Sequence, residues 1–407
     1  MTPTTLVAVA TLEAVHVEPE DASSVRGRLA RVAGHRVSLL LAPAVLYLLV
    51  RELGLLALRL MADRWDKDVT GALTSWDGQW FLGIAGGGYG DVPSGLVDAF
   101  GRRSAETPLA FFPGYPVLVR WLDALPGVGT VGAAFAVSLV SGLVCAYGLA
   151  RLGASVFGGS RRAGLVLVVL FAASPMSVVL SMAYSEATFC ALAAWSLVGV
   201  VERRWLLAGL CCAGAGLVRP TAGALVLAVC AAAAAAIWQR RDGWRPWAGG
   251  LLAPLGLAGY LGYVAVVTGR WDGWFAVQRD GWDSRFDGGA ATWKFALLVL
   301  GDPRSVLELA TVWFLVAALV LVALGLRRGP EWPLVVYGAG VLAMDLGSNG
   351  LMNSKARLLL PAFTLLVPVA LALARRRTPT VVAVLVGVSV FSAWFGAYAI
   401  TAWRYAI

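Results

Sequence analysis

Charged residues are scarce in this chain. Asp, Glu, Lys and Arg make up 14% of its 407 residues, whereas 59% of the residues are hydrophobic. Soluble domains carry about 25% charged residues, so a soluble protein is excluded. Strands that alternate apolar and polar residues, the signature of an outer-membrane barrel, are also absent. Apolar stretches of about 20 residues, long enough to cross a bilayer as a helix, recur instead. We therefore expect an all-α, multi-pass membrane protein.

Residue types that bind metals or carry catalysis in many enzymes are also few. The two histidines, His16 and His35, precede the first long apolar stretch, which excludes histidine chemistry from the membrane domain. The cysteines form no CxxC pair, so neither a zinc site nor a disulfide framework is indicated. The phosphate-loop motif GxxxxGK followed by Ser or Thr does not occur, and we expect no ATP hydrolysis. The cysteines, all within apolar stretches, are Cys145, Cys190, Cys211, Cys212 and Cys230.

The apolar stretches predict about eleven transmembrane helices. Residues 1–36 precede them and read as a disordered cytoplasmic tail, whereas residues 37–407 read as a single membrane domain. The shortest helical stretch alternatively forms a half-helix that ends at Arg219-Pro220, because proline disfavours helical geometry in the preceding residue. The predicted spans are 37–60, 129–150, 163–182, 186–201, 205–218, 221–238, 247–268, 305–326, 332–346, 356–374 and 380–402.

Paired arginines occupy every second gap between these stretches. The net charge of +9 does not indicate a nucleic-acid partner, because the positive residues cluster in short gaps between apolar spans. This is the positive-inside pattern, and it predicts a cytoplasmic N-terminus and an outer C-terminus. The gaps contain Arg161-Arg162, Arg203-Arg204, Arg240-Arg241, Arg327-Arg328 and Arg375-Arg376-Arg377.

Two long loops then lie on the non-cytoplasmic side. They cover residues 61–128 and 269–304, and we expect interfacial helices in the first. The short turns 183–185 and 347–355 lie on the same side. The inner gaps are too short to hold a domain. Any chemistry should therefore take place on the outer side.

Asp77 stands between two tryptophans in the first outer loop. A helix over residues 75–85 would place Trp76 and Trp80 on one face, at the level of the lipid headgroups. A carboxylate at the membrane surface among aromatic rings suits chemistry on a lipid-linked polar substrate. The alternative is an interfacial anchor in which the aspartate only caps a helix. Further candidate acids in this loop are Asp66, Asp68 and Glu106.

Cations on the outer side are a second signal. Arg219, Lys355 and Arg357 lie at membrane edges where the positive-inside pattern does not place them. Charges at this depth are costly unless they are functional or paired. A lipid phosphate would find its natural partners there. The alternative is snorkelling, or pairing with acids such as Asp345.

Two further outer segments carry candidate substrate-binding residues. The second loop places Gln278, Arg279 and Trp282 among carboxylates and other rings, a mixture that suits sugar recognition. An interfacial aromatic loop would look the same. In the other segment, Tyr184 precedes Glu186 at the start of a helix, where the carboxylate either serves the helix dipole or has a functional role.

In order along the chain, six segments resemble the PIG-V mannosyltransferase family. That family belongs to the multi-pass glycosyltransferases with the GT-C fold. Each segment is short, but the ordered set is specific, and a composition rich in Arg, Ala and Gly is typical of a bacterial member. The segments are WDGQWFLGIAGGGY, AFFPGYP, SPMSVVLSMAYSEATF, GLVRPTA, the stretch 278–282 and NSKARLLLPAF.

The resemblance implies a GT-C-like fold and transfer of mannose from polyprenyl-phosphate mannose to a lipid-linked glycan acceptor. It places the active site on the non-cytoplasmic face of the cell (plasma) membrane, and it implies that the first outer loop bears the catalytic acid, which maps to Asp77.

We hypothesise inverting transfer with Asp77 as the general base. Arg219, Lys355 and Arg357 would stabilise the departing phosphate. No cofactor is required. The carboxylates of the outer loops, together with Glu186, are nevertheless numerous enough to bind a divalent metal ion. The residues assigned to substrate binding are Trp76, Trp80, Tyr184, Gln278, Arg279 and Trp282.

Two other functions compete with this one. A polytopic lipid or sugar transporter would need polar residues along a membrane path. The spans contain few beyond Arg51 and Glu52, which we interpret as a contact within the bundle, and no inverted repeat is evident. A non-catalytic subunit of a glycosyltransferase complex is the other alternative, and it would tolerate substitution of Asp77.

Overall fold

The computed structural model describes residues 22–327, 331–403 and 405, with side chains from Leu40 onward. The chain divides into two units, residues 1–42 and 43–407. In its described part, the first unit is helical from Ala22, in α1 (Ala22–Arg64). The disordered tail predicted for residues 1–36 falls largely on residues 1–21, which lie outside the described residues. All contacts discussed below belong to the second unit.

The described part of the chain is helical and contains no strand beyond an isolated bridge between Phe286 and Ser348. This confirms the all-α class. After α1, the helices are α2 (Val69–Leu73), α3 (Asp77–Gly87), η1 (Thr107–Ala110), α4 (Gly114–Asp123), α5 (Thr130–Ser155), α6 (Arg161–Ala172), η2 (Ser177–Ser181), α7 (Glu186–Val201), α8 (Trp205–Gly216), α9 (Ala222–Trp238), α10 (Arg245–Leu252), α11 (Leu255–Thr268), α12 (Gly273–Trp282), α13 (Ala290–Gly301), α14 (Val306–Leu326), α15 (Trp332–Gly347), η3 (Met352–Ser354), α16 (Lys355–Leu358), η4 (Leu360–Leu366), α17 (Val367–Ala374) and α18 (Thr378–Thr401).

Several of these helices can cross a membrane. In the described residues, five helical segments are long and apolar enough, and a sixth counts if a pair bent by 52° forms one span. Shorter apolar helices, among them α7, α8, α9 and α15, accompany them. The chain is therefore a multi-pass membrane protein, while the count of eleven spans stays a prediction. The five segments are Leu40–Arg64, Thr130–Ser155, Arg245–Thr268, Val306–Leu326 and Thr378–Thr401, and the bent pair is Met352–Leu358 with Leu360–Ala374.

Three of the predicted spans are not continuous helices: 163–182, 356–374 and 247–268, the last being divided into α10 and α11 next to Pro254. The stretch 163–182 is divided into α6 and the 3₁₀ helix η2. Pro175 lies in the break and disfavours helical geometry in the residue before it. The stretch 356–374 is likewise divided, with non-helical backbone at Ala362, next to Pro361.

Arg51 satisfies the backbone at the first of these breaks. Its buried guanidinium donates to the carbonyl oxygens of Ala172 and Ser177 and, over 2.7 Å, to the hydroxyl of Ser177. The last carbonyls of a helix lack partners within the helix, and lipid offers none. Arg51 is thus the bundle contact that the sequence predicts. The same prediction is wrong for its neighbour Glu52, which is exposed on α1.

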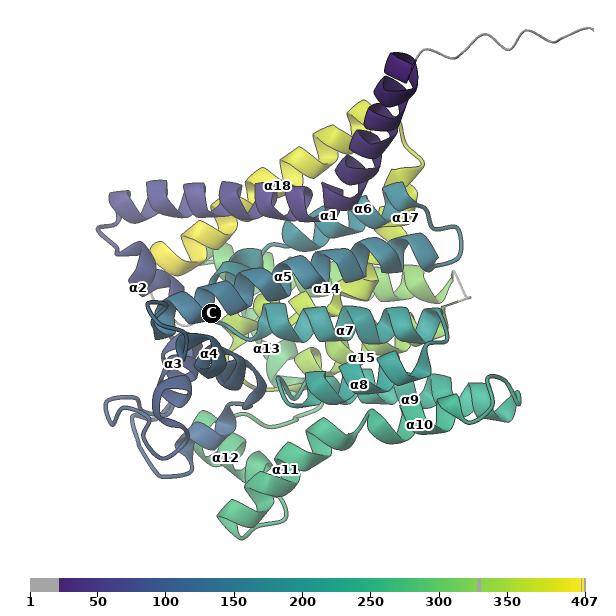
Figure 1. Ribbon diagram of the computed structural model, residues 1–407. Helices are drawn as coiled ribbons and strands as arrows, with labels where there is room; N and C mark the ends of the chain where they lie inside the picture. Colours follow the sequence, from purple (N-terminus) through teal and green to yellow (C-terminus); the bar gives the residue numbers. More distant parts are fainter. Residues whose placement is uncertain (1–21, 328–330, 404, 406–407) are drawn as a thin grey trace, which may run out of the picture. The chain divides into compact units, whose positions relative to one another are not determined.

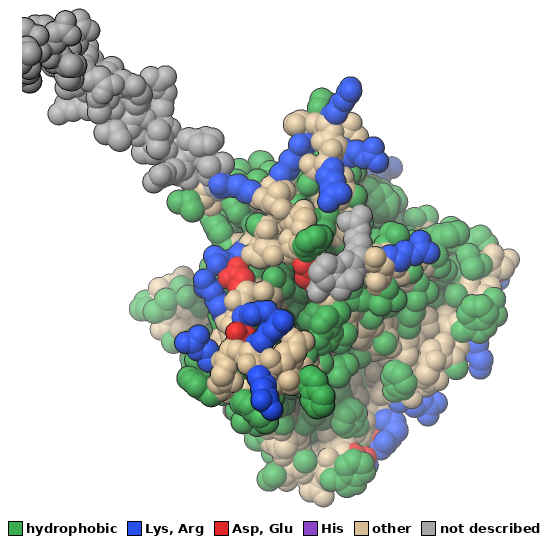
Figure 2. All heavy atoms as spheres, turned by 90° about the vertical axis from the view of Figure 1, so that its right-hand side faces the viewer, with side chains coloured by type: hydrophobic (Ala, Val, Ile, Leu, Met, Phe, Trp, Pro, Cys, Tyr) green, Lys and Arg blue, Asp and Glu red, His purple; other side chains and the backbone are tan. Residues whose placement is uncertain are grey.

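The arginine-rich turns lie together at one end of the bundle. Arg203 is 3.9 Å from Asp242 across two turns, and the guanidinium of Arg162 donates to the backbone carbonyl of Arg376 over 3.0 Å. Figure 2 shows Lys and Arg side chains standing out from this end among hydrophobic ones. We term it the arginine face. Its exposed arginines are Arg161, Arg162, Arg203, Arg204, Arg240, Arg241, Arg327, Arg375, Arg376 and Arg377.

The opposite end carries the two long loops and is termed the loop face. Helices α2, α3, α4 and α12 gather there (Figure 1). The second loop is joined to the turn after α15, where Asp287 N donates to Gly347 O over 2.8 Å and Asn349 N donates to Arg285 O over 3.0 Å. The expected interfacial helices of the first loop thus correspond to short helices placed at one end of the bundle.

Candidate active site

Asp77 is the first residue of α3, directly after a strained residue. Trp76 has φ 52° and ψ −116°, a left-handed conformation that is rare for a bulky side chain. The strain turns the chain sharply between Ser75 and the helix. Such outliers persist only where the surrounding structure holds them, and they cluster at functional sites. The Asp77 carboxylate consequently stands at a helix start with 29% of its side chain exposed.

Asp77 is linked, through Arg357, to a series of ion pairs between residues that are distant in sequence. Arg357 lies 2.8 Å from Asp77 and 3.6 Å from Glu186, and Arg219 lies 2.8 Å from Glu186. The side chain of Glu186 is fully buried, and those of Arg357 and Arg219 are 8% and 11% exposed. We term these residues the charged quartet. Its two cations and two anions compensate each other at a depth where an unpaired charge would be costly. Asp77 is the most exposed member and therefore the one that a substrate can reach.

Tyr184 fixes the orientation of the quartet. Its ring lies 5.2 Å from the centre of the Arg357 guanidinium, and its hydroxyl donates to the carbonyl of Ser75 over 3.3 Å. Burial, and next the charge of Asp77, raise the pKa of Tyr184 well above its usual range. The phenol is therefore neutral and remains a hydrogen-bond donor. Tyr184 thus contacts both Ser75, which precedes the strained Trp76, and Arg357, which pairs with Asp77.

The outer turn that carries Tyr184 is held in place by hydrogen bonds to neighbouring helices. The hydroxyl of Ser138 in α5 donates to Met182 O over 2.8 Å, and Ala183 N donates to Leu73 O over 3.0 Å. Ser185 accepts a hydrogen bond from Arg219 over 3.0 Å. Sequence reasoning did not assign these serines a role. Their signal is weak, because a single hydroxyl in an apolar helix rarely reveals its partner.

The AFFPGYP segment docks against the chain just before Arg219. Gly114 N donates to Leu217 O over 2.7 Å. A Cβ atom at Gly114 would lie 2.7 Å from a methyl carbon of Val218 and 2.8 Å from the Leu217 carbonyl oxygen. Only glycine allows this approach. The segment therefore sets the position of the backbone that leads into Arg219.

Lys355 has a different environment from Arg219 and Arg357. Its buried ammonium donates to the carbonyl oxygens of Asp345 and Ser348, over 2.5 Å and 2.8 Å. These carbonyls belong to the end of α15, where a cation is favoured by the helix dipole. The described contacts of Lys355 thus hold a helix end, and none of them reaches the charged quartet.

An aromatic wall follows Asp77 along α3. Trp80 is buried, stacks on Phe111 with ring centroids 5.3 Å apart, and meets Trp282 edge-on at 5.7 Å. The guanidinium of Arg103 lies 5.3 Å from the centre of the Trp80 ring. Gln278 donates to the carbonyl of Ala110 over 3.3 Å, so its amide fastens α12 to the first loop. The wall joins the two outer loops beside the quartet.

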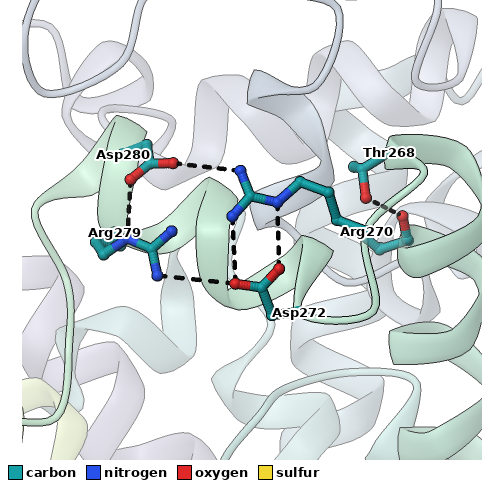
Figure 3. A network of polar contacts seen from close by, with 6 residues as sticks. Thr268, Arg270, Asp272, Arg279 and Asp280 are labelled. Carbon is teal, nitrogen blue, oxygen red and sulfur yellow. Dashed lines mark hydrogen bonds and ion pairs between the residues drawn. The ribbon is translucent and has the colours of Figure 1, made fainter.

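Arg279 belongs to a ring of ion pairs at the start and end of α12, drawn in Figure 3. Arg270 lies 3.2 Å from Asp272 and 3.9 Å from Asp280, while Arg279 lies 3.8 Å from Asp272 and 2.9 Å from Asp280. The hydrogen bond from Arg270 lowers the pKa of Asp272. All four side chains retain contact with solvent. The ring is therefore available to a ligand from the loop face.

The other candidate acids lie apart from the quartet. Asp66 has a positive φ of 50° in the turn after α1, and Asp68 caps α2 by accepting from Gly71 N over 2.5 Å. Glu106 is exposed and precedes η1. Among the described residues, no group of three or more His, Cys, Asp or Glu side chains could hold a metal ion.

Comparisons with known proteins can now be set beside this geometry. No protein-family model matches the chain. It is 33% identical to mouse GPI alpha-1,6-mannosyltransferase 2 over 151 residues, which cover 35% of this chain and 27% of that protein. The protein of the same name from Cricetulus griseus is 32% identical over 150 residues, again 35% and 27% of the two chains. This chain resembles GPI mannosyltransferases. The predicted resemblance to the PIG-V family is confirmed, although the chain aligns with only about a quarter of the length of these curated relatives.

A solved structure shows the fold. The chain superposes on ArnT from Cupriavidus metallidurans, crystallised with bound undecaprenyl phosphate, with a TM-score of 0.50 and 15% identity over 82% of this chain and 62% of that one. The predicted GT-C-like architecture is thereby confirmed. At this level of identity, the likeness concerns the fold alone.

Proposed function

We propose that this chain is a membrane glycosyltransferase that moves mannose from polyprenyl-phosphate mannose to a lipid-linked glycan on the non-cytoplasmic face of the plasma membrane. The proposal is supported by the similarity to mannosyltransferases and by a fold shared with a protein that binds undecaprenyl phosphate. The observation that carries it is the charged quartet. A partly exposed carboxylate beside two arginines at a membrane edge suits transfer from a lipid phosphate.

In this mechanism, Asp77 acts as the general base. The acceptor hydroxyl attacks the anomeric carbon of mannose and gives its proton to the carboxylate. The bond from that carbon to the phosphate oxygen breaks, and its electron pair leaves with the polyprenyl phosphate. Attack from the face opposite the phosphate inverts the anomeric centre. Because the leaving group is a stable anion, no general acid is needed.

Arg219 and Arg357 stabilise the departing phosphate in this scheme. Preorganised cations lower the barrier when negative charge develops near them in a poorly solvated site. Arg357 contacts both Asp77 and Glu186, so it also orients the base. Lys355 holds two carbonyls at the end of α15 and has no described contact with the quartet, so the scheme assigns it no part in phosphate binding. The scheme requires no cofactor.

The test measures transfer of radiolabelled mannose from polyprenyl-phosphate mannose into glycolipid, in membranes that contain the chain and native lipid extract. We expect Asp77→Asn to reduce transfer by about 100-fold or more, the usual range for loss of a general base. Asp66→Asn is the matched control from the same loop, and we expect it to stay within about twofold of wild type. Size-exclusion profiles in detergent check that both variants fold.

Two outcomes would contradict the proposal at different points. Near-normal transfer by a folded Asp77→Asn protein would place the base elsewhere. Failure of the wild-type chain to transfer sugar from polyprenyl-phosphate mannose, or from other polyprenyl-phosphate hexoses, would reject the enzymatic function and favour a non-catalytic subunit.

A further inference from the structure

A polar cleft of about 340 Å³ opens between the first outer loop and the α11–α12 segment. Its volume lies in the range of pockets that hold small molecules, about 300–1,000 Å³. All of its lining residues lie outside the candidate membrane spans. They are Asp98, Arg102, Arg103, Ser104, Glu106, Thr107, Arg270, Ala276, Val277, Asp280, Gly281 and Trp282.

The walls of the cleft are fixed by hydrogen bonds. Asp98 is buried and accepts from Phe100 N and Arg102 N, each over 2.9 Å, which closes a tight turn. Ala99 N donates to Gly281 O over 3.2 Å, and the Arg102 guanidinium donates to the carbonyl of Asp280. The turn of the first loop is therefore attached to the end of α12. A preformed cleft binds a ligand with little loss of loop entropy.

The charges that line the cleft cancel. Three arginines and three carboxylates line it, and the hydroxyls of Ser104 and Thr107 add groups that both donate and accept. A site for a phosphate would carry an excess of cations. Equal numbers of cations and carboxylates beside an indole ring instead match the hydroxyl groups of a neutral sugar, which both donate and accept. The indole N–H of Trp282 is buried and lacks an acceptor in the described structure.

The cleft adjoins the proposed base through Trp80. This residue lies one helical turn after Asp77, and its ring contacts both Trp282 and Arg103 from the cleft wall. The arginines of the quartet, which would hold the donor phosphate, pair with Glu186 and Asp77 and are not among the residues that line the cleft. Donor and acceptor thus have separate places beside one carboxylate.

We propose that this cleft is the acceptor subsite and binds a neutral, polyhydroxylated sugar of the acceptor glycan. The inference rests on the proposed function, since it assigns the cleft to the acceptor of that reaction. Glu106 and Asp280 accept hydrogen bonds from sugar hydroxyls, Arg270 donates to them, and Trp282 packs against the ring. These residues set specificity for the acceptor and take no part in the proton transfer.

The kinetic test separates the two substrates. Octyl α-D-mannopyranoside serves as acceptor probe, and polyprenyl-phosphate mannose as donor, with detergent-solubilised full-length protein. We expect the double variant Glu106→Gln, Asp280→Asn to raise the KM for the acceptor about 10-fold, while kcat and the donor KM stay within about twofold. The control is Asp302→Asn, an exposed acid outside the cleft. An unchanged acceptor KM, or an equal rise for both substrates, overturns the subsite.

A binding test works without turnover. Saturation-transfer NMR with methyl α-D-mannopyranoside should give ring-proton signals with wild type that fall at least twofold in the double variant. Equal signals in both proteins, or stronger signals with mannose 6-phosphate, overturn a neutral-sugar site. Binding that depends on the cleft, together with no transfer from any donor, supports a neutral-sugar site in the cleft and rejects the enzymatic function and with it the acceptor role. Transfer with an unchanged acceptor KM in the double variant supports the enzymatic function and rejects the acceptor subsite.

Discussion

Arg357 shows how one side chain can serve two acids. Its guanidinium lies between Asp77 and Glu186 and over the ring of Tyr184. A planar fork with several donors can satisfy this arrangement, whereas a lysine ammonium is a single point of charge. The identity of the cation should therefore matter as much as its charge.

We predict that Arg357→Lys lowers mannose transfer about 10- to 100-fold, because a compact ammonium lacks the rigid planar fork that fixes the two carboxylates and stacks on the Tyr184 ring. The matched control is Arg304→Lys, whose side chain is 83% exposed and paired with Asp302, and it should stay within about twofold. Initial transfer rates and detergent thermal melts measure the two effects. A folded Arg357→Lys protein with wild-type rates would show that charge alone is sufficient.

At the residue scale, the sequence predicts the members of the quartet well and their partners poorly. Charged residues stand out in a chain with 14% charge, so Asp77, Glu186, Arg219 and Arg357 are all recognisable. Lys355 gives the same signal, yet it binds backbone carbonyls. The strained φ of Trp76 leaves no trace in the residue type. A sequence shows which charged side chains would be costly to bury. The residues that compensate those charges are set by the fold.

Among the elements, the start of α4 is the most tightly constrained part of the site. Its first residue, Gly114, lies against the Leu217 carbonyl and the Val218 side chain, just before Arg219. We predict that Gly114→Ala destabilises the protein by about 1–3 kcal/mol, the usual cost of overpacking, and also lowers transfer. Gly262→Ala in α11 is the control, because no atom lies within 4 Å of the added methyl. Thermal melts decide the matter, and equal stability of the two variants would contradict a required glycine.

Helix boundaries were predicted well where the sequence pattern was simple. The span 186–201 coincides with α7, and 205–218 and 221–238 differ from α8 and α9 by one or two residues. The prediction of one continuous helix over 163–182 was wrong, because an apolar pattern alone does not show a break at Pro175. The carbonyls exposed by that break are satisfied by Arg51. The ends of helices are set by local residues, and breaks within them also by distant ones.

The whole molecule has two unlike ends. Arginines cover one, and the charged quartet and the polar cleft belong to the other. The positive-inside rule predicts that the arginine face is cytoplasmic. The sequence predicts this polarity because the rule needs only gap composition. The placement of the cleft, by contrast, depends on contacts between loops that are distant in sequence.

We predict that a cysteine at position 302 is labelled by an impermeant maleimide in intact cells, and one at position 241 only after permeabilisation. Each is introduced as Asp302→Cys or Arg241→Cys into a chain whose own five cysteines are replaced. The cysteine-free chain is the blank. The reverse labelling pattern would show that the orientation is opposite to the predicted one, with the quartet on the cytoplasmic side.

The bonds of Arg51 also bear on how the chain is made. Its backbone acceptors at Ala172 and Ser177 follow it by 121 and 126 residues. At a synthesis rate of about 5–20 residues per second, roughly 6–25 seconds pass before those carbonyls exist. During that interval the first helix carries an arginine whose final partners have not been translated. We therefore expect the first helix to reach its final place in the bundle only after the chain through Ser177 has been synthesised.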